Sequence, residues 1–214
     1  MTAPEWPSGP LDPALARGEI HVWQASLDGW RTGQALARLT DAERARAAEI
    51  VRPSARSRWI VARASLRVIL GRYLGIEEIA LAVEPGGRPY LDDGPTFSVS
   101  HSRGLALYAV AANTPLGVDV ELVRDEVPVA ALRRRLAASD SSTPRQLLAQ
   151  WTRREALLKC ASPEPWTCAI DLGRDSVATL ASAAPPSQVR LWTFDTHRES
   201  PHAERRGRPT GAPI

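Results

Sequence analysis

The chain has few cysteines and no long apolar run, and these absences exclude several classes of protein. Its two cysteines, Cys160 and Cys168, are too few for a disulfide framework and lie in no metal-binding spacing. No apolar run approaches the ~20 residues that a membrane-spanning helix needs. Residues 1–18 contain no basic stretch followed by an apolar one, so no secretion signal is expected. We therefore expect a reduced, cytoplasmic protein without a membrane partner.

The common nucleotide-binding loops are missing as well. The chain contains neither Gly-x-x-x-x-Gly-Lys nor Gly-x-Gly-x-x-Gly, and no Cys/His metal pattern. Its net charge of +3 permits anionic partners without identifying one. Arginine supplies all but one of the 27 basic residues and there are seven tryptophans, which raises nucleic-acid binding as an alternative. The small net charge and the scattered tryptophans disfavour it, so no nucleic-acid partner is expected.

Lysine occurs once, as Lys159, in a chain that otherwise always uses arginine. A solitary lysine indicates a position that needs a compact ammonium with a movable pKa. It follows Glu155 by four residues in a segment with helical periodicity, which also allows a plain ion pair of about 0.3 kcal/mol. Glu155 itself falls within an arc of apolar residues, where a carboxylate needs a partner or a function. The arc is Leu147, Leu148, Trp151 and Leu158.

Two acids spaced by one residue, Asp119 and Glu121, follow an apolar run. Side chains at positions i and i+2 of a strand share a face, so a strand at 118–123 would project both carboxylates together. Such a pair offers hard oxygen ligands to Mg²⁺. The alternative for the same two residues is a pair of exposed acids without a function.

Both helices and strands are expected along the chain. Thr40 and Glu43 form a capping box before a helix at 41–51. The next helix, at 54–74, carries an arginine stripe of Arg56, Arg63 and Arg67, which is either a solvated face or a phosphate-binding edge. A third helix begins near 143. Strands are expected at 19–28, 97–100, 105–112, 118–123, 176–180 and 189–195, with a turn at His101.

Four segments stand in a fixed order: GRP at 87–89, FSVSHS at 97–102, GVDVE at 117–121 and WTRREALLK at 151–159. Together they resemble the signature of the Sfp-type 4′-phosphopantetheinyl transferases. The resemblance implies an α/β (α+β) fold of two similar halves, each a helix packed on a small antiparallel sheet. The halves would be related by a pseudo-two-fold axis, with the active site in the cleft between them. The expected ranges are a flexible lead-in at 1–18, halves at 19–112 and 113–195, and a disordered basic tail at 196–214.

The resemblance also implies a reaction. It is the transfer of the 4′-phosphopantetheine arm of coenzyme A to a serine of an apo acyl or peptidyl carrier protein, releasing adenosine 3′,5′-bisphosphate. Coenzyme A is then a substrate and Mg²⁺ the metal, with Mn²⁺ as an alternative. The carrier protein would belong to fatty-acid, polyketide or nonribosomal-peptide synthesis, without a choice among them. A monomer is expected, because one chain holds both halves.

Site residues follow from the same resemblance. The implied metal ligands are Asp119, Glu121 and Glu155. The implied catalytic residues are Glu155, Lys159 and His101, with Glu155 as the first choice for the proton acceptor and Lys159 as the second. The implied coenzyme A contacts are Arg44, Arg46, Arg58, Arg88, Ser100, His101, Asp119 and Lys159.

The chain departs from the family pattern in three places. Ser98 stands where the family commonly has asparagine, and residues 160–163 replace a glycine-containing turn after Lys159. The link at 122–150 lacks a phenylalanine-then-acid element that would help to shape the carrier-protein surface. These departures motivate an alternative function: a non-catalytic member of the fold that binds coenzyme A or a carrier protein without turnover.

Overall fold

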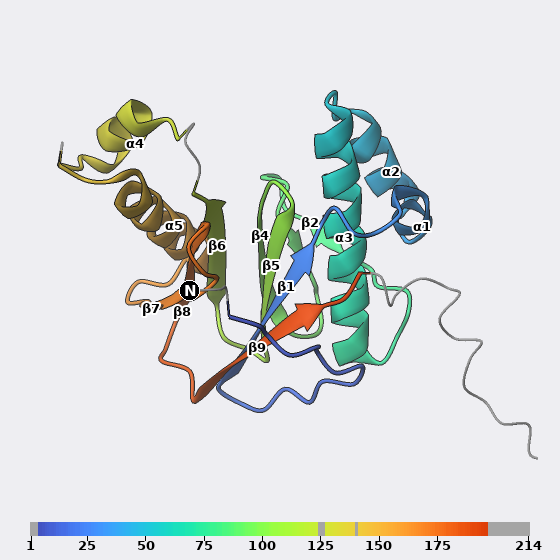
Figure 1. Cartoon of the computed structure of the whole chain (residues 1–214). Coiled ribbons are helices and arrows are strands. Elements are labelled where there is room, and N and C mark those ends of the chain that lie inside the picture. Colours follow the sequence, from blue (N-terminus) through green and yellow to red (C-terminus); the bar gives the residue numbers. More distant parts are fainter. Residues whose placement is uncertain (1–3, 124–126, 140, 197–214) are drawn as a thin grey trace, which may run out of the picture.

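The structure is a computed structural model that describes residues 4–123, 127–139 and 141–196. Its layers run helix, sheet, sheet, helix (Figure 1). Helix α3 (Pro53–Leu74) lies outside the first sheet and helix α5 (Pro144–Cys160) outside the second. The expected mixed α and β architecture with small sheets is confirmed, whereas the pseudo-two-fold relation stays a prediction.

The first sheet has the strand order β4-β5-β1-β9. The β4–β5 and β5–β1 pairs are antiparallel, but β9 pairs with β1 in parallel. The expectation of purely antiparallel sheets is therefore wrong here, because the chain returns from the second sheet and fills the free edge of β1. It also means that β9, predicted within the second half at 113–195, belongs to the sheet of the first. The strands are β1 (Glu19–Ser26), β4 (Thr96–Ser102), β5 (Leu105–Ala111) and β9 (Gln188–Phe194).

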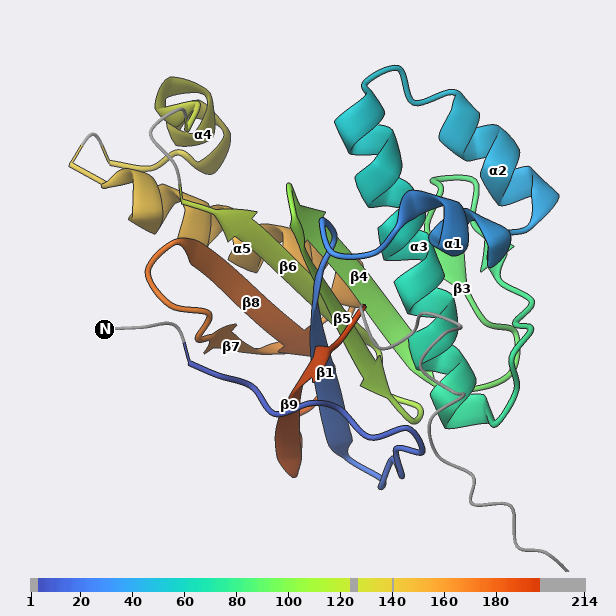
Figure 2. The same ribbon diagram turned by 45° about the vertical axis from the view of Figure 1, so that its right-hand side comes forward.

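Helix α3 ends as predicted, since Gly75 adopts the left-handed conformation that closes the helix. Two shorter helices, α1 (Thr32–Ala37) and α2 (Asp41–Ala48), lie against it (Figure 2). The capping box of Thr40 and Glu43 is present at the start of α2. A small hairpin of β2 (Ala82–Val83) and β3 (Pro89–Tyr90) follows α3.

The second sheet is antiparallel with the order β6-β8-β7. Its strands are β6 (Leu116–Leu122), β7 (Trp166–Ile170) and β8 (Ser176–Ser182). Helix α4 (Val129–Leu136) packs on the first turns of α5. A second capping box, of Thr143 and Gln146, starts α5 with Pro144 in its first turn, as Ser-Thr-Pro predicts.

Two apolar clusters hold these layers together. One lies between α3 and the first sheet and includes Trp23, Leu66 and Tyr108. The other lies between the two sheets, where Val118 and Val120 of β6 meet apolar residues of β1 and β5. Because the inner faces of both sheets share one cluster, the edge strands β4 and β6 are held beside each other.

The N-terminal segment is packed rather than free of the sheet. Trp6 is buried in the cluster between the sheets, and Gly9 packs directly on the ring of Trp23. The backbone of residues 6–9 bonds to Thr193 on β9. Of the predicted flexible lead-in at 1–18, the described residues 4–18 therefore form a strap along the first sheet.

Other predicted ranges fall partly or wholly outside the description. The expected disordered tail at 196–214 lies outside the described residues except for Thr196. The monomeric state expected from the sequence stays a prediction. None of the helices in the described part of the chain has the length and apolar content of a membrane span.

Candidate active site

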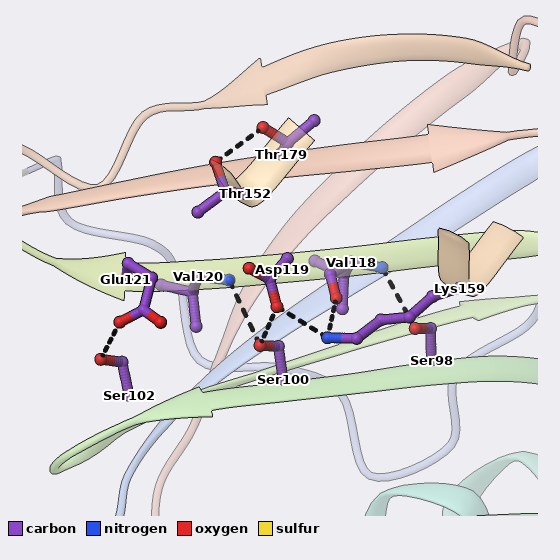
Figure 3. Close-up of polar contacts among 10 residues, drawn as sticks. All are labelled: Ser98, Ser100, Ser102, Val118, Asp119, Val120, Glu121, Thr152, Lys159 and Thr179. Atoms are coloured by element: carbon purple, nitrogen blue, oxygen red, sulfur yellow. Dashed lines mark hydrogen bonds and ion pairs between the residues drawn. The ribbon is translucent and has the colours of Figure 1, made fainter. Parts of the chain in front are cut away.

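Strand β6 carries the paired acids, as the alternation of the sequence predicts. The apolar residues Val118 and Val120 are buried between the sheets. Asp119 is also buried, with 6% of its surface exposed, and Glu121 is partly buried. Both carboxylates accept hydrogen bonds from serines of β4, so both turn toward the same neighbouring strand (Figure 3).

Lys159 joins the end of α5 to this strand. Its ammonium donates to Asp119 Oδ1 at 2.7 Å and to the carbonyl oxygen of Val118 at 3.0 Å (Figure 3). The close approach of helix and strand depends on Gly117, where a Cβ atom would overlap the carbonyl oxygen of Ala156. The plain ion pair of Lys159 with Glu155, which the sequence allows as an alternative, is absent among the described residues, and Lys159 pairs with Asp119 instead.

Arg88 links the GRP turn to the end of α5, beside Lys159. Its guanidinium donates to the carbonyl oxygen of Lys159 at 2.7 Å, across the border between the two sheets. A pocket of about 300 Å³ at this border is lined by Arg88, Lys159 and Ser98, among others. An adjoining pocket of about 280 Å³ also contains Arg88 and Lys159, together with Phe97 of β4 and Leu116 of β6. Two cationic side chains from distant segments therefore face one hollow.

His101 lies within β4, not in a turn. The strand continues to Ser102, and the reversal occurs at Arg103 and Gly104, with Arg103 at a φ of 50°. The predicted turn at His101 is therefore wrong, because pairing with β5 extends two residues further than the apolar pattern indicates. On a strand, His101 and Ser100 point to opposite faces, so the histidine faces α3 while the serine faces β6.

The ring of His101 lines a pocket of about 200 Å³ with Trp59, Arg63 and Gly87. The residue is exposed, yet neighbouring protein atoms desolvate the ring, and this desolvation lowers its pKa. The positive charge of Lys159 lowers the pKa further, whereas the negative charge of Asp119 opposes the change. His101, Lys159 and Asp119 are therefore electrostatic neighbours.

The carboxylate contacts come from alternate positions of β4. Ser100 donates to Asp119 Oδ1 and Ser102 donates to Glu121 Oε2, each at 2.7 Å. Ser100 was predicted to contact coenzyme A, and in the structure its hydroxyl donates a hydrogen bond to Asp119. Ser102 was not predicted at all. The spacing of Ser98, Ser100 and Ser102 is a signal of one polar strand face, but a sequence does not tell which strand that face meets.

Glu155 makes no hydrogen bond or ion pair with any described residue and is partly buried. It lies one helical turn before Lys159, on the part of α5 that runs along β6. The predicted apolar arc around it is wrong in one member, since 63% of Leu158 is exposed. The buried face of α5 instead contains Leu148, Thr152, Ala156 and Cys160. Glu155 therefore stands at the edge of this face as a carboxylate without a partner.

Three of the arginines predicted to contact coenzyme A lie elsewhere. Arg58 forms a two-bond pair with Asp28, and Arg46 pairs with Glu49. Arg44 bonds to Asp41 and lines a different pocket, on the side of α2. None of the three lines the pockets that contain His101, Arg88 and Lys159. Their contact with coenzyme A stays a prediction.

Arg63 belongs to the arginine stripe of α3, which the sequence allows as either a solvated face or a phosphate-binding edge. Its two companions are engaged, Arg56 with backbone carbonyls at the end of α2 and Arg67 with Glu43 and a carbonyl. Arg63 lies over the ring of Trp59 in the His101 pocket, with the Glu43 carboxylate 3.7 Å away. Its Nη1 atom is buried and has no hydrogen-bond partner within the described ranges. The stripe is therefore not a solvated face.

The acids fit a hard cation in chemistry, although no group of three or more potential ligands gathers among the described residues. Asp119 Oδ2 is buried and has no hydrogen-bond partner among the described residues, which is costly for an anionic oxygen unless a cation or donor reaches it. Glu121 likewise keeps one oxygen free of described partners. The strand therefore presents two carboxylate oxygens that remain available.

The loop after Lys159 keeps the expected form without glycine. Ala161 adopts the left-handed conformation, with a φ of 52°, and its amide donates to the carbonyl oxygen of Leu157. This is the closing geometry that glycine usually supplies. The replacement of glycine thus leaves the end of α5 intact, at some cost in backbone strain.

Comparison with known proteins gives the family. No family model matches the chain. It is 32% identical over 173 residues to the 4′-phosphopantetheinyl transferase HetI of Nostoc sp., in an alignment that covers 72% of this chain and 73% of that protein. The chain therefore belongs to the 4′-phosphopantetheinyl transferase superfamily. It is an enzyme, a transferase of that class.

Proposed function

We propose that the protein transfers the 4′-phosphopantetheine arm of coenzyme A to a serine hydroxyl of an apo acyl or peptidyl carrier protein. One observation carries the proposal: the contact of Lys159 with Asp119, beside Arg88. Through these contacts the GRP turn, the end of α5 and the acidic strand come together, and Arg88 and Lys159 line one hollow. A site with fixed cations and free carboxylate oxygens suits a phosphoryl group better than a neutral substrate.

In this reaction the serine oxygen forms a bond to the phosphorus that bears the pantetheine arm. The bond from that phosphorus to the bridging oxygen of the pyrophosphate breaks, and adenosine 3′,5′-bisphosphate leaves with the electron pair. The serine proton must go to an acceptor. Glu155 suits this role because its carboxylate has no partner in the part of the chain that the structure describes. Lys159, which donates to two acceptors, serves instead as a fixed cation.

Charge on the pyrophosphate is offset by basic side chains from both sides of the border. Lys159 and Arg88 face the same pocket, where each can stabilise negative charge that grows on the leaving group. His101 faces the adjoining pocket with Arg63. A phosphate beside His101 would raise its lowered pKa, which links binding of the anion to uptake of a proton.

Asp119, Glu121 and Glu155 would hold a divalent cation, Mg²⁺ or alternatively Mn²⁺. When bound, the ion neutralises phosphate charge and strengthens the electrophilic character of the phosphorus. The chain's own residues supply the ligand oxygens and fix their directions. Ser100 and Lys159 hold one oxygen of Asp119, which leaves its buried second oxygen free.

Intact-protein mass spectrometry of an apo carrier protein, incubated with this protein, coenzyme A and Mg²⁺, tests the reaction. A mass gain of one phosphopantetheine that disappears with chelator is expected. Chromatography of the same mixture should show adenosine 3′,5′-bisphosphate. Binding of coenzyme A without any mass gain across acyl and peptidyl carriers would favour the non-catalytic alternative instead.

A further inference from the structure

Three serines at alternate positions of β4 face an edge of β6 that has no partner strand in its sheet. Their hydroxyl oxygens accept hydrogen bonds from backbone amides at alternate positions of β6. We call this set the serine ladder. Figure 3 shows two of its pairs, Ser98 with Val118 at 3.1 Å and Ser100 with Val120 at 3.3 Å. The third pair is Ser102 with Leu122 at 3.3 Å. The ladder satisfies amide groups that an edge strand would otherwise leave open.

Two members of the ladder have a second function, because they also donate to a carboxylate. For Asp119 this donation is shared, since both Ser100 and Lys159 bond to the same oxygen of a short, buried side chain. For Glu121, the hydroxyl of Ser102 is the sole polar partner among the described residues. Glutamate has more rotatable bonds than aspartate and Glu121 is less buried, so its direction depends on this one bond.

We propose that Ser102 is a positioning residue, which fixes the Glu121 carboxylate for the divalent cation of the proposed function. The hydroxyl engages Oε2 at 2.7 Å, the length of a strong hydrogen bond to an anion, and leaves Oε1 available. At the same time its oxygen accepts a hydrogen bond from the amide of Leu122, which holds the hydroxyl beside β6. The inference rests on the proposed function, since it assigns the metal site to these acids.

Ser98 provides a matched control within the same ladder. It accepts from an amide of β6 as Ser102 does, but the residue before that amide is Gly117, which has no carboxylate. Both serines are buried, with 3% of Ser98 and 8% of Ser102 exposed. Ser98→Ala therefore removes a ladder bond alone, whereas Ser102→Ala removes a ladder bond and the bond to Glu121.

The test is a calorimetric titration of Mn²⁺ into protein saturated with coenzyme A, without a carrier protein, so that no turnover occurs. Partners of metal ligands commonly contribute tenfold or more in affinity, so Ser102→Ala should raise the Kd for Mn²⁺ by about tenfold. Ser98→Ala, which removes a ladder bond but no bond to a carboxylate, should change the Kd by less than about twofold. Ser102→Thr, which keeps the hydroxyl, should restore most of the affinity.

The outcomes separate the inference from the function on which it rests. If wild type binds Mn²⁺ and both alanine variants weaken binding equally, or neither does, the ladder only joins the strands and the inference is wrong. If wild type with coenzyme A does not bind Mn²⁺ at all, the metal assignment fails, and the role of Ser102 fails with it. Transfer to a carrier protein, measured in parallel, tells whether the reaction survives either result.

Discussion

Lys159 donates a hydrogen bond of 2.7 Å to Asp119, which links the last turn of α5 to the acidic strand β6. The same ammonium donates to a backbone carbonyl of that strand, so its position is set by two acceptors. Only 26% of the lysine side chain is exposed, and 9% of the aspartate. The single lysine of the chain thus occupies a place where a compact cation is enclosed on several sides.

Replacing this lysine by arginine should reduce the rate of transfer by about a hundredfold, a typical cost of misplacing one stabilising group. A planar guanidinium keeps the charge but does not fit between the two acceptors that hold a compact ammonium. The measurement is the initial rate of mass gain of a carrier protein, with Arg17→Lys, an exposed change in the N-terminal segment, as the control. A near wild-type rate for Lys159→Arg would contradict the role of Lys159 as a fixed cation.

Glu155→Gln should abolish transfer while leaving the fold intact. Its carboxylate has no described partner, so the change in the free energy of unfolding should stay within about 0.5 kcal/mol. Loss of a proton acceptor should lower the rate by about 10²- to 10⁴-fold. Urea unfolding and transfer assays check the two parts, and Glu164→Gln, at an exposed site after α5, serves as the control. Retained activity in Glu155→Gln would contradict both proposed roles of Glu155, as proton acceptor and as metal ligand.

Ala161→Gly should stabilise the protein. A left-handed conformation costs a residue other than glycine roughly 1–2 kcal/mol. Glycine avoids this cost, but it offsets part of the gain because it loses more conformational freedom on folding than alanine does. We expect a net gain of about 0.5 kcal/mol in the free energy of unfolding, with transfer unchanged. Ala149→Gly, on the exposed face of the same helix, should destabilise by about 1 kcal/mol. A loss of stability in both variants would show that Ala161 is not strained.

The sequence predicts the elements that carry the site because their signals are local. Alternation defines β6, and the capping box with Pro144 defines the start of α5. The partners of these elements are set by distant residues and could not be derived in the same way. Periodicity gives no reason for Lys159 to bond to Asp119, or for Ser102 to bond to Glu121.

Errors in the prediction have the same origin. Proline and glycine in the first eighteen residues suggest flexibility, but Gly9 fits against the Trp23 ring because it lacks a side chain. The parallel pairing of β9 with β1 depends on an edge that only the assembled sheet offers. Leu158, expected in an apolar arc, is exposed because α4 covers that arc only over the first turns of α5, whereas the later turns bury a different face with Ala156 and Cys160.

Gly117→Ala should separate α5 from β6. The added Cβ would overlap the carbonyl oxygen of Ala156 and lie 2.7 Å from the amide nitrogen of Cys160, both of which are helix backbone. Overpacking of this kind costs about 1–3 kcal/mol in the free energy of unfolding. Because Lys159 lies at the same contact, transfer should fall as well.

The matched control for this change is Gly33→Ala in α1, where an added Cβ meets nothing within 4 Å. There the loss of freedom in the unfolded chain should raise the free energy of unfolding by about 0.4–1 kcal/mol. Chemical denaturation of both variants gives the two numbers. Equal stability of Gly117→Ala and wild type would mean that helix and strand are not in the close contact described.

Stability should fall as the pH drops below about 6.5, the ordinary pKa of histidine, because His21 is fully buried. Its Nδ1 bonds to the Tyr73 hydroxyl at 2.9 Å, and that hydroxyl accepts from Trp23, so the tyrosine proton points to the ring. The other ring nitrogen then donates to Glu19 at 3.2 Å, which is the neutral form of the imidazole. A proton on Nδ1 would face the tyrosine proton.

Burial lowers the pKa of His21, and the charge of Arg190 adds to this, whereas Glu19 opposes it. Below the unfolded pKa the unfolded chain takes up a proton that the folded chain refuses, so the free energy of unfolding declines until the pH reaches the folded pKa. Glu19, whose pKa Arg190 lowers to about 2, adds its own loss of stability only at lower pH, below its unfolded value of 4.5. Thermal unfolding across this range should show a smaller pH dependence for His21→Gln than for wild type. His101→Gln removes the other described histidine with a lowered pKa and should leave the contribution of His21 in place. An unchanged slope in His21→Gln would assign the acid sensitivity to other groups.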